Sequence, residues 1–331
     1  MKFKSPSVFL RAPAKINLSL KIVGRREDGY HLIESLFAPI SLFDEITIAP
    51  VALAGADAGA GAIKDICTYK LGSENGLVLN FQDDTVLKAL KVLRAKVAPF
   101  SLSYQKVTVI KRIPFGAGLG GGSSDAASVL THMSHALSTT EALTQISPPT
   151  FSQKLSPARS KEIITESDLR EVASAVGSDV PFFLQNGPAY VSGVGENVVT
   201  CKLDKLFIAL VKPDFSVETK RAYQWFDAET KLTRSSINVT FPVISGAKFF
   251  GIKDIVRDLD NDLEKPVEAR HPEITRLKKV LVDLGALGSQ MSGSGSSVFG
   301  LFETAEKTER AIIELKKIFP SSYLFFSCHT L

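Results

Sequence analysis

Alternating apolar and polar positions dominate the first fifty residues and predict an N-terminal sheet. The polar loop RREDGYH separates two strand-like runs, VFLRAPAKINLSLKIVG and SLFDEITIAPVAL. The small-residue segment AGADAGAGAIKD is typical of a surface loop, and TVLKALKVLRAKV carries apolar residues at helical spacing. The β-branched run KVTVIKRI then predicts a strand that leads directly into PFGAGLGGGSSDAASVL.

The second part of the chain mixes predicted helices and strands. The polar stretch 138–167 favours a loop or a partly ordered insertion, and the helix DLREVASAVG follows it. VPFFLQNGPAYVSGVGENVV predicts buried strands and turns, and LFIALVKPD predicts a buried strand. Helices are expected near FFGIKDIVRDLDNDLEKPV, in ITRLKKVLVDLG and in EKTERAIIELKKIF, and strands in SSVFGLF and YLFFSCHTL. Helices packed on a sheet in this way give an α+β fold.

Composition narrows the class of protein. A chain of 331 residues, 44% hydrophobic, is expected to form two domains, here 1–200 and 201–331. The surplus of 39 Lys and Arg over 35 Asp and Glu is too small for a dedicated nucleic-acid binder. Cys67, Cys201 and Cys328 are odd in number and lack CxxC spacing, which favours a reducing compartment. No apolar run reaches the roughly 18 residues of a membrane span, and the start lacks a signal peptide, so we expect a cytoplasmic protein.

The junction from Pro114 to Ser124 points to phosphate binding. A strand, a tight glycine loop and a helix starting near Ser123 to Asp125 would aim backbone N–H groups and a helix N-terminus at one spot. Glycine lets the backbone approach a phosphate closely and adopt positive φ at little cost. Five glycines in the seven positions 116–122 would cost stability without a ligand to justify them.

Walker A loops, dinucleotide loops and ligand-free turns fit this junction less well. A Walker A loop needs a lysine after its last glycine, whereas Gly122 and Ser123 follow Gly121. A dinucleotide loop needs an acidic residue at the end of a second strand, but Glu141 lies in the polar segment STTEAL. A glycine turn without a ligand remains the structural alternative.

The motif PFGAGLGGGSSDAA resembles the phosphate loop of the GHMP kinase superfamily. The earlier segment PAKINLSLKIVGRREDGYH is similar to the family of kinases that act on 4-diphosphocytidyl-2-C-methyl-D-erythritol, and VGSDVPFFL, PAYVSGVGE and MSGSGSSVFGLF resemble further motifs in the same order. The resemblance implies a two-domain α+β fold, with an N-terminal ribosomal-S5-like β-α domain that binds ATP and a C-terminal α+β domain. It also implies phosphorylation of the substrate's 2-hydroxyl by Mg·ATP in the non-mevalonate isoprenoid pathway.

This resemblance implies two catalytic residues. Lys15 in APAKIN would stabilise charge on the transferring phosphoryl group, and Asp179 in GSDVPFF would orient the hydroxyl and accept its proton. The two are expected to be neighbours in space. A solvated strand position for Lys15 and a helix or turn cap for Asp179 are the structural alternatives.

Substrate recognition is expected in five residues. Asn17 lies two residues after Lys15, so both side chains share one face of a strand, where the amide could hold substrate or be a buried structural group. The resemblance implies that Tyr30 stacks on the cytosine base and that His31 contacts its polar edge. Tyr223 is the expected second wall around the base, with Thr219 nearby.

The nucleotide is expected along the glycine loop. Ser123 and Ser124 could cap the helix, contact phosphate or, for Ser124, bind Mg²⁺. Lys111 could border the adenine or be an exposed strand residue. The loop Ser292 to Ser296 resembles the third family motif, which implies that it packs beside the phosphate loop, with a tight structural turn as the alternative. The expected ATP-binding residues are Lys111, Pro114, Phe115, Gly116, Ala117, Gly118, Leu119, Gly120, Gly121, Gly122, Ser123 and Ser124.

Three features depart from the family pattern. Asp84 stands where an Asn is expected, Asp125 stands where some relatives have Asn, and the 138–167 stretch is unusually long and polar.

The alternative functions are another GHMP small-molecule kinase, for mevalonate, homoserine or a sugar, and a non-catalytic nucleotide-binding relative. We expect small-molecule partners only, no nucleic acid or membrane, and a monomer or homodimer.

Overall fold

A computed structural model describes residues 7–51, 64–73, 75–79, 81, 84–98, 102–138, 163–230 and 249–331. The chain divides into two compact units, and each takes several separate segments. The first unit contains Met1–Ala12, Asp44–Arg112 and Gly122–Leu184, and the second contains Pro13–Phe43, Ile113–Gly121 and Gln185–Leu331. The domain boundary expected near residue 200 stays a prediction, because it concerns domains rather than these units.

The strands of the first unit are centred on β5 (Gln105–Lys111), the run of alternating β-branched residues. β5 pairs antiparallel with the last part of β2 (His31–Pro50), from Glu45 to Pro50, and parallel with β3 (Ile66–Leu71). The short β4 (Val78–Leu79) adds an antiparallel edge to β3. The continuous strands β1 (Val8–Arg25) and β2 pass through both units.

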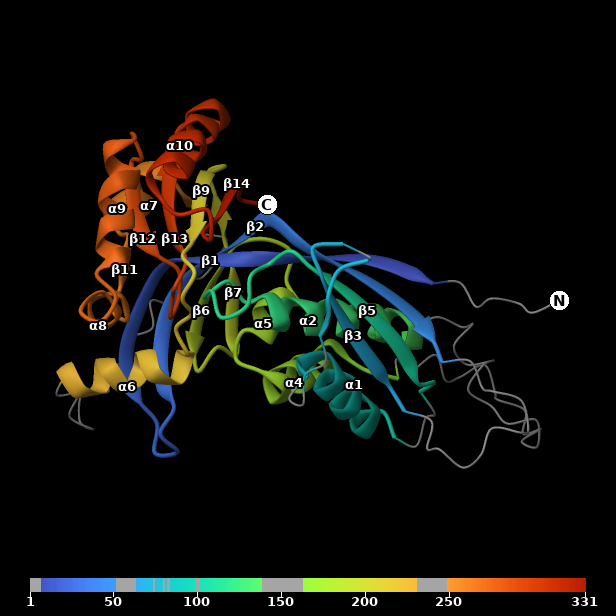
Figure 1. Ribbon diagram of the computed structural model, residues 1–331. Helices are drawn as coiled ribbons and strands as arrows, with labels where there is room; N and C mark the ends of the chain where they lie inside the picture. The colour runs from blue at the N-terminus through green and yellow to red at the C-terminus, as the bar shows by residue number, and fades with distance from the viewer. Residues whose placement is uncertain are drawn as a thin grey trace, which may run out of the picture. The chain divides into compact units, whose positions relative to one another are not determined.

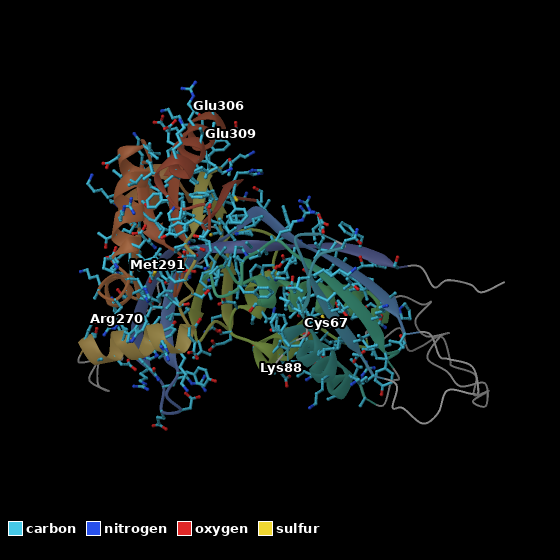
Figure 2. The ribbon with its side chains drawn as sticks, viewed as in Figure 1. Cys67, Lys88, Arg270, Met291, Glu306 and Glu309 are labelled. Atoms are coloured by element: carbon cyan, nitrogen blue, oxygen red, sulfur yellow. The ribbon has the colours of Figure 1, made fainter. Side chains whose placement is uncertain are left out.

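Helices α1 (Thr85–Lys96), α2 (Gly121–Ser138) and α4 (Glu166–Val176) supply apolar faces to the core of the first unit (Figure 1). Each apolar face follows from residues at helical spacing, such as Val86, Ala89, Leu90 and Leu93 in α1. Asp84 begins α1 by accepting the Leu87 N–H at 2.9 Å. Lys88 of α1 donates to the Val176 carbonyl at the end of α4 at 2.7 Å (Figure 2).

In the second unit, the strands β12 (Gly288–Met291), β13 (Val298–Phe302), β9 (Phe207–Lys212) and β14 (Leu324–His329) form an antiparallel sheet in that order. Every residue of β13 is buried, because alternate side chains enter two different hydrophobic clusters. Val298 and Phe302 belong to one cluster, and Phe299 and Leu301 belong to the other. Helices α9 (Glu273–Asp283) and α10 (Ala305–Ile318) cover one face of this sheet (Figure 1).

The remaining elements of the second unit extend β1 and β2 and fill the connections. β6 (Ala189–Gly193) pairs antiparallel with β2 and with β7 (Asn197–Thr200), and β11 (Asp260–Asn261) pairs parallel with β1. β8 (Lys202–Leu203) pairs with β10 (Phe249–Phe250). The other helices are α5 (Val180–Phe183, in the first unit), α6 (Thr219–Glu229), α7 (Ile252–Arg257) and α8 (Glu264–Glu268).

Most predicted elements are confirmed, including the α+β fold, whereas two expectations need correction and one helix was missed. VPFF is the helix α5 rather than a strand, because Pro181 stands in the first turn, where its missing N–H is not needed. The helix after the glycine loop begins at Gly121, before the expected start. Helix α6 was not expected. The predicted loop at 54–65 and the insertion at 138–167 lie largely outside the described residues.

Two further expectations about composition can be checked. Cys67, Cys201 and Cys328 are buried free thiols, and Cys67 lies in the first unit (Figure 2). None of the helices in the described ranges combines the length and apolar composition that a membrane crossing needs.

Candidate active site

The glycine-rich loop joins β5 to α2 and requires glycine at three of its positions. Gly116, Gly118 and Gly120 have φ angles of 57°, 73° and 68°, in the left-handed region that disfavours side chains. Ala117 and Leu119 lie between them and are buried in a hydrophobic cluster of the second unit. The loop therefore alternates buried side chains with glycines in the left-handed region.

The same loop packs closely against the loop Ser292 to Ser296. The Ser292 hydroxyl donates to the Gly118 carbonyl at 3.1 Å, and the Ser297 N–H donates to the Ala117 carbonyl at 3.2 Å. A Cβ atom on Gly118 would lie 2.0 Å from the Ser292 carbonyl oxygen, so only glycine fits there. The predicted association of these two motifs is thus present in the structure of the second unit.

The first turn of α2 carries the two serines expected near phosphate. Ser124 is fully buried, and its Oγ has no hydrogen-bond partner among the described residues. A buried hydroxyl without a partner costs free energy unless a ligand or water satisfies it. Ser124 and the N-terminus of α2 therefore fit a phosphate group or a Mg²⁺ ion bound with it.

Lys15 and Asn17 are buried and share one face of β1, as their spacing predicts. Lys15 Nζ donates to Asn17 Oδ1 at 2.6 Å and lies 4.6 Å from the centre of the Phe37 ring. The Asn17 amide donates to Ser35 Oγ at 3.0 Å. Lys15 is therefore not the solvated strand residue of the alternative, and Asn17 helps to hold it.

The glycine loop and the Ser292–Ser296 loop both contact the strand that carries Lys15. The Lys15 N–H donates to the Leu119 carbonyl at 3.0 Å. A Cβ atom on Gly293 would lie 3.0 Å from Asn17 Oδ1 and 3.4 Å from Lys15 Nζ. A buried cation and two glycine-containing loops are thus gathered in one part of the second unit.

Asp179 immediately precedes α5 in the first unit and is half-buried. Its side chain makes no capping hydrogen bond to that helix, so the structural alternative of a helix cap does not hold. Because Lys15 belongs to the second unit, the expected proximity of Asp179 and Lys15 stays a prediction.

Lys111 lies in a buried charged cluster rather than on an exposed strand position. Its Nζ donates to Asp125 at 2.9 Å and also forms an ion pair with Asp44. The lysine side chain is 3% exposed and both carboxylates are fully buried. Whether Lys111 also borders adenine stays a prediction.

The charges of this cluster do not balance, and the titration of two of its groups reflects that. Burial raises the pKa of Asp125 to about 7, against the attraction of Lys111 and with a further contribution from Asp44. Burial alone would lower the pKa of Lys111, but the two carboxylates outweigh it and the pKa is raised. Lys111 therefore stays charged, and Asp125 holds a proton more readily than an ordinary carboxyl group.

The residues expected around the cytosine base lie in the second unit. His31 stacks on Tyr223 of α6, with ring centres 4.7 Å apart and an angle of 21° between the rings. Thr219 at the start of α6 shares a hydrogen bond of 3.0 Å with Ser294 Oγ. Tyr30, in the turn before β2, is 65% exposed and therefore accessible to a ligand.

Three residues of these clusters were not found from the sequence. Asp227 on α6 contacts His31, and Asp44 pairs with Lys111. The Asn261 side-chain amide donates to the carbonyls of Met291 and Gly293 at 2.9 and 2.8 Å, which fixes the loop Ser292 to Ser296. Each contact joins residues at least thirty positions apart, so no local sequence pattern predicts it.

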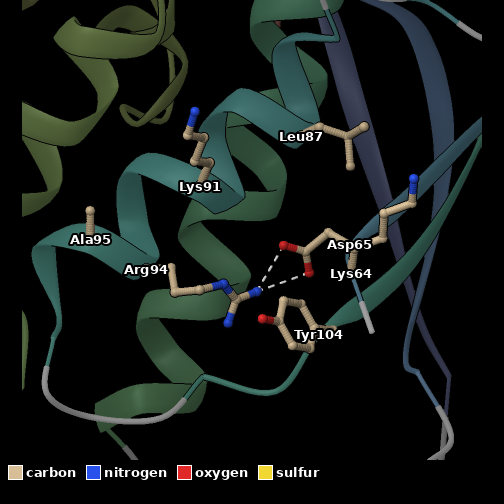
Figure 3. Close-up of a pocket in the computed structure, with 7 residues that line it drawn as sticks. All are labelled: Lys64, Asp65, Leu87, Lys91, Arg94, Ala95 and Tyr104. Atoms are coloured by element: carbon tan, nitrogen blue, oxygen red, sulfur yellow. Dashed lines mark hydrogen bonds and ion pairs between the residues drawn. The ribbon is translucent and has the colours of Figure 1, made fainter. Parts of the chain in front are cut away.

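A separate hollow of about 490 Å³ opens on the first unit beside α1 (Figure 3). Arg94 donates to both carboxylate oxygens of Asp65, at 2.9 and 2.8 Å, and its guanidinium lies 4.4 Å from the centre of the Tyr104 ring. The walls contain none of the residues predicted for nucleotide or substrate: Lys64, Asp65, Leu87, Lys91, Arg94, Ala95 and Tyr104. Among the described residues, no group of three or more His, Cys, Asp or Glu side chains is arranged to hold a metal ion.

Comparison with known proteins identifies the family. The description "GHMP kinases N terminal domain" matches residues 84–187, and "GHMP kinases C terminal" matches residues 252–321. A 4-diphosphocytidyl-2-C-methyl-D-erythritol kinase from Caldanaerobacter subterraneus is 32% identical over 94% of this chain and 93% of its own. The kinase of the same name from Thermodesulfovibrio yellowstonii is 34% identical over 91% and 92% of the two chains.

Solved structures agree with this result. A crystal structure of 4-(cytidine 5'-diphospho)-2C-methyl-D-erythritol kinase has a TM-score of 0.65 and 28% identity over 98% of this chain and 100% of its own. Homoserine kinase from Cytophaga hutchinsonii has a TM-score of 0.60 at 17% identity over 99% and 95% of the two chains, which shows a shared fold. The chain therefore belongs to the 4-diphosphocytidyl-2-C-methyl-D-erythritol kinase family of GHMP kinases.

Proposed function

We propose that this protein transfers the γ-phosphoryl group of ATP to the 2-hydroxyl of 4-diphosphocytidyl-2-C-methyl-D-erythritol, in the non-mevalonate isoprenoid pathway. The observation that carries the proposal is the similarity to kinases of that name over more than nine-tenths of both chains. The close packing of the glycine loop on the loop Ser292 to Ser296 agrees with it.

The phosphates of ATP are proposed to lie along the glycine loop and the start of α2. The left-handed glycines carry no side chain that would keep a phosphate away from the backbone, and the helix N-terminus attracts negative charge. Ser124, whose buried hydroxyl lacks a partner among the described residues, would hold a phosphate oxygen or Mg²⁺. Mg²⁺ bound with ATP supplies charge neutralisation at the phosphates.

Lys15 and Asp179 are the proposed catalytic residues. Lys15 would stabilise negative charge on the transferring group, and its hydrogen bond to Asn17 would fix the position of its ammonium group. Asp179 would orient the substrate hydroxyl and accept its proton. Because the transition state of phosphoryl transfer needs mainly positioning and charge stabilisation, these two roles suffice.

The cytidine part of the substrate is proposed to bind beside Tyr30, His31 and Tyr223. Tyr30 is exposed and can stack on the base, while His31 can contact its polar edge. One face of Tyr223 is already covered by His31, so the base would meet its other face or its edge. Thr219 and Asn17 are proposed to contact the rest of the substrate.

The proposal is tested by measuring ADP release with Mg·ATP and one acceptor at a time. The cytidyl substrate should support turnover, whereas mevalonate, homoserine and galactose should not. In Asp179→Asn, loss of the general base should reduce kcat by roughly 10²- to 10⁴-fold with little change in nucleotide binding.

The other outcomes of this assay replace the proposal with its alternatives. Turnover of a different acceptor would assign another GHMP activity. Binding of nucleotide without any turnover would indicate a non-catalytic relative. The Mg²⁺ requirement, the cytoplasmic location and a monomeric or homodimeric state are part of the same proposal, and each needs its own measurement.

A further inference from the structure

His31 is held by a carboxylate that nothing in its own sequence neighbourhood provides. His31 Nε2 lies 2.7 Å from Asp227 Oδ1, and Arg25 lies 3.3 Å from the other oxygen of Asp227. The His31 ring stacks on Tyr223 and meets Phe226 edge-on, with ring centres 6.4 Å apart. The ring contacts therefore restrain the orientation of the His31 ring, and the contact with Asp227 restrains its Nε2 atom.

This contact determines where the proton of a neutral imidazole lies. A carboxylate can only accept a hydrogen bond, so the nitrogen that faces Asp227 must carry the N–H. The other nitrogen, Nδ1, then presents a lone pair and acts as an acceptor. Within the described residues, His31 Nδ1 has no hydrogen-bond partner. The His31 side chain is 8% exposed, so a ligand can reach only part of the ring.

We propose that Asp227 is a positioning residue that makes the site prefer cytosine over uracil, by keeping His31 Nδ1 as an acceptor. This inference rests on the proposed function, in which His31 faces the polar edge of the base. On that edge, cytosine has a single donor group, the exocyclic amine, which can pair with an acceptor nitrogen. Uracil has a carbonyl oxygen in the same place, and two acceptors facing each other leave both unsatisfied.

The neighbours of the pair oppose the two ways in which this arrangement could be lost. A flip of the imidazole would place a carbon against the Asp227 carboxylate and give up the hydrogen bond. A movement of Asp227 away from the ring is opposed by Arg25, which holds the second carboxylate oxygen. Stacking on Tyr223 keeps the ring in its plane while either change is resisted.

The test measures binding of cytidine diphosphate and uridine diphosphate by titration calorimetry, in alkaline buffer where imidazoles are neutral. The wild type should bind the cytidine compound more tightly. In Asp227→Asn the amide can either accept from or donate to Nε2, so the proton position is no longer fixed. The ratio of the two dissociation constants should then fall roughly tenfold, the value of one well-made hydrogen bond.

Two further variants separate positioning from folding. Asp227→Glu keeps the carboxylate and should retain more of the preference than Asp227→Asn does. Glu229→Gln removes a negative charge from the same helix and should leave the ratio unchanged. The Glu229 side chain pairs with Arg270, which is labelled in Figure 2, and not with His31. ATP binding and kcat with the cytidyl substrate should change much less than the ratio in all three variants.

The outcomes distinguish this inference from the proposed function. An unchanged ratio in Asp227→Asn, or equal binding of both diphosphates by a wild type that turns over the cytidyl substrate, would overturn the role of Asp227 alone. Absence of both turnover and cytidine diphosphate binding in the wild type would overturn the proposed function, and the inference with it.

Discussion

Each unit of the molecule contains a basic side chain paired with aspartate, a lysine in the first unit and a histidine in the second. The two sites differ in how deeply these side chains are buried. In the first unit, Lys111 lies between Asp44 and Asp125 with at most 3% of any of these side chains exposed. In the second unit, the side chains of His31 and Asp227 are 8% and 28% exposed. A buried cluster has little surface to offer a ligand, so its charges act mainly on the stability of the fold, whereas the partly exposed pair can act on recognition.

Removal of the cation from the buried cluster should have the largest effect on stability. Lys111→Met would leave two carboxylates buried without their counter-charge, and the free energy of unfolding should fall by about 3 to 5 kcal/mol. Urea unfolding measures this change. Lys91→Met, at an exposed position on α1, is the matched control and should change stability by no more than about 0.5 kcal/mol.

A double variant tests whether the uncompensated carboxylates cause this loss of stability. Adding Asp125→Asn to Lys111→Met removes one of the two uncompensated charges and should restore part of the lost stability. A loss in Lys111→Met as small as that of the control would mean that the cluster is not what holds this region together.

The next largest effect concerns the pH dependence of stability. Because the pKa of Asp125 is raised from 3.8 to about 7, the folded protein binds this proton more tightly than the unfolded chain does. The resulting stabilisation is fully present below pH 3.8 and is lost as the pH rises through about 7. Its size is on the order of 4 kcal/mol. Asp125→Asn should flatten the curve of unfolding free energy against pH between about pH 4 and 7, measured by urea titration at each pH.

A glycine from each unit extends the comparison from side chains to the backbone. Gly72 and Gly118 have nearly equal φ angles, 72° and 73°, but a Cβ atom meets nothing within 4 Å at Gly72 and a carbonyl oxygen at 2.0 Å at Gly118. Both alanine variants should lose stability through backbone strain, and Gly118→Ala should lose about 1 to 3 kcal/mol more. Only Gly118→Ala should also raise the KM for ATP, as steady-state kinetics would show, and equal effects of the two substitutions would contradict the close packing of the two loops.

The sequence predicted the features that depend on local patterns. The alternation in KVTVIKRI gave β5, and the need for positive φ explained the glycines of the loop before their angles were known. VPFF was misinterpreted because an apolar run of four residues fits a strand or a buried helix equally well. Helix α6 was missed because only Ala222 and Phe226 of its eleven residues are buried.

The charged contacts could not be predicted, because they depend on long-range pairing. Asp44 occupies an inward-facing position of β2 between Leu42 and Ile46, where a carboxylate is costly without a partner. That partner, Lys111, is 67 residues away in the sequence, and Asp227 is 196 residues from His31. The sequence therefore identified candidate site residues by motif but not the carboxylates that hold them in place.

Of these substitutions, Tyr30→Ala should have the smallest effect on the stability of the fold, while it should clearly weaken binding of the substrate. This side chain is 65% exposed, so Tyr30→Ala should change the free energy of unfolding by no more than about 0.5 kcal/mol. Loss of stacking on the base should cost about 1 to 3 kcal/mol of binding, which raises the KM for the cytidyl substrate and leaves the KM for ATP nearly unaltered. Tyr104→Ala, at an exposed tyrosine of the first unit, should change neither KM. If Tyr30→Ala raised both KM values equally, Tyr30 would not stack on the base. The second unit would then lack this contribution to substrate recognition, which distinguishes it from the buried cluster of the first unit.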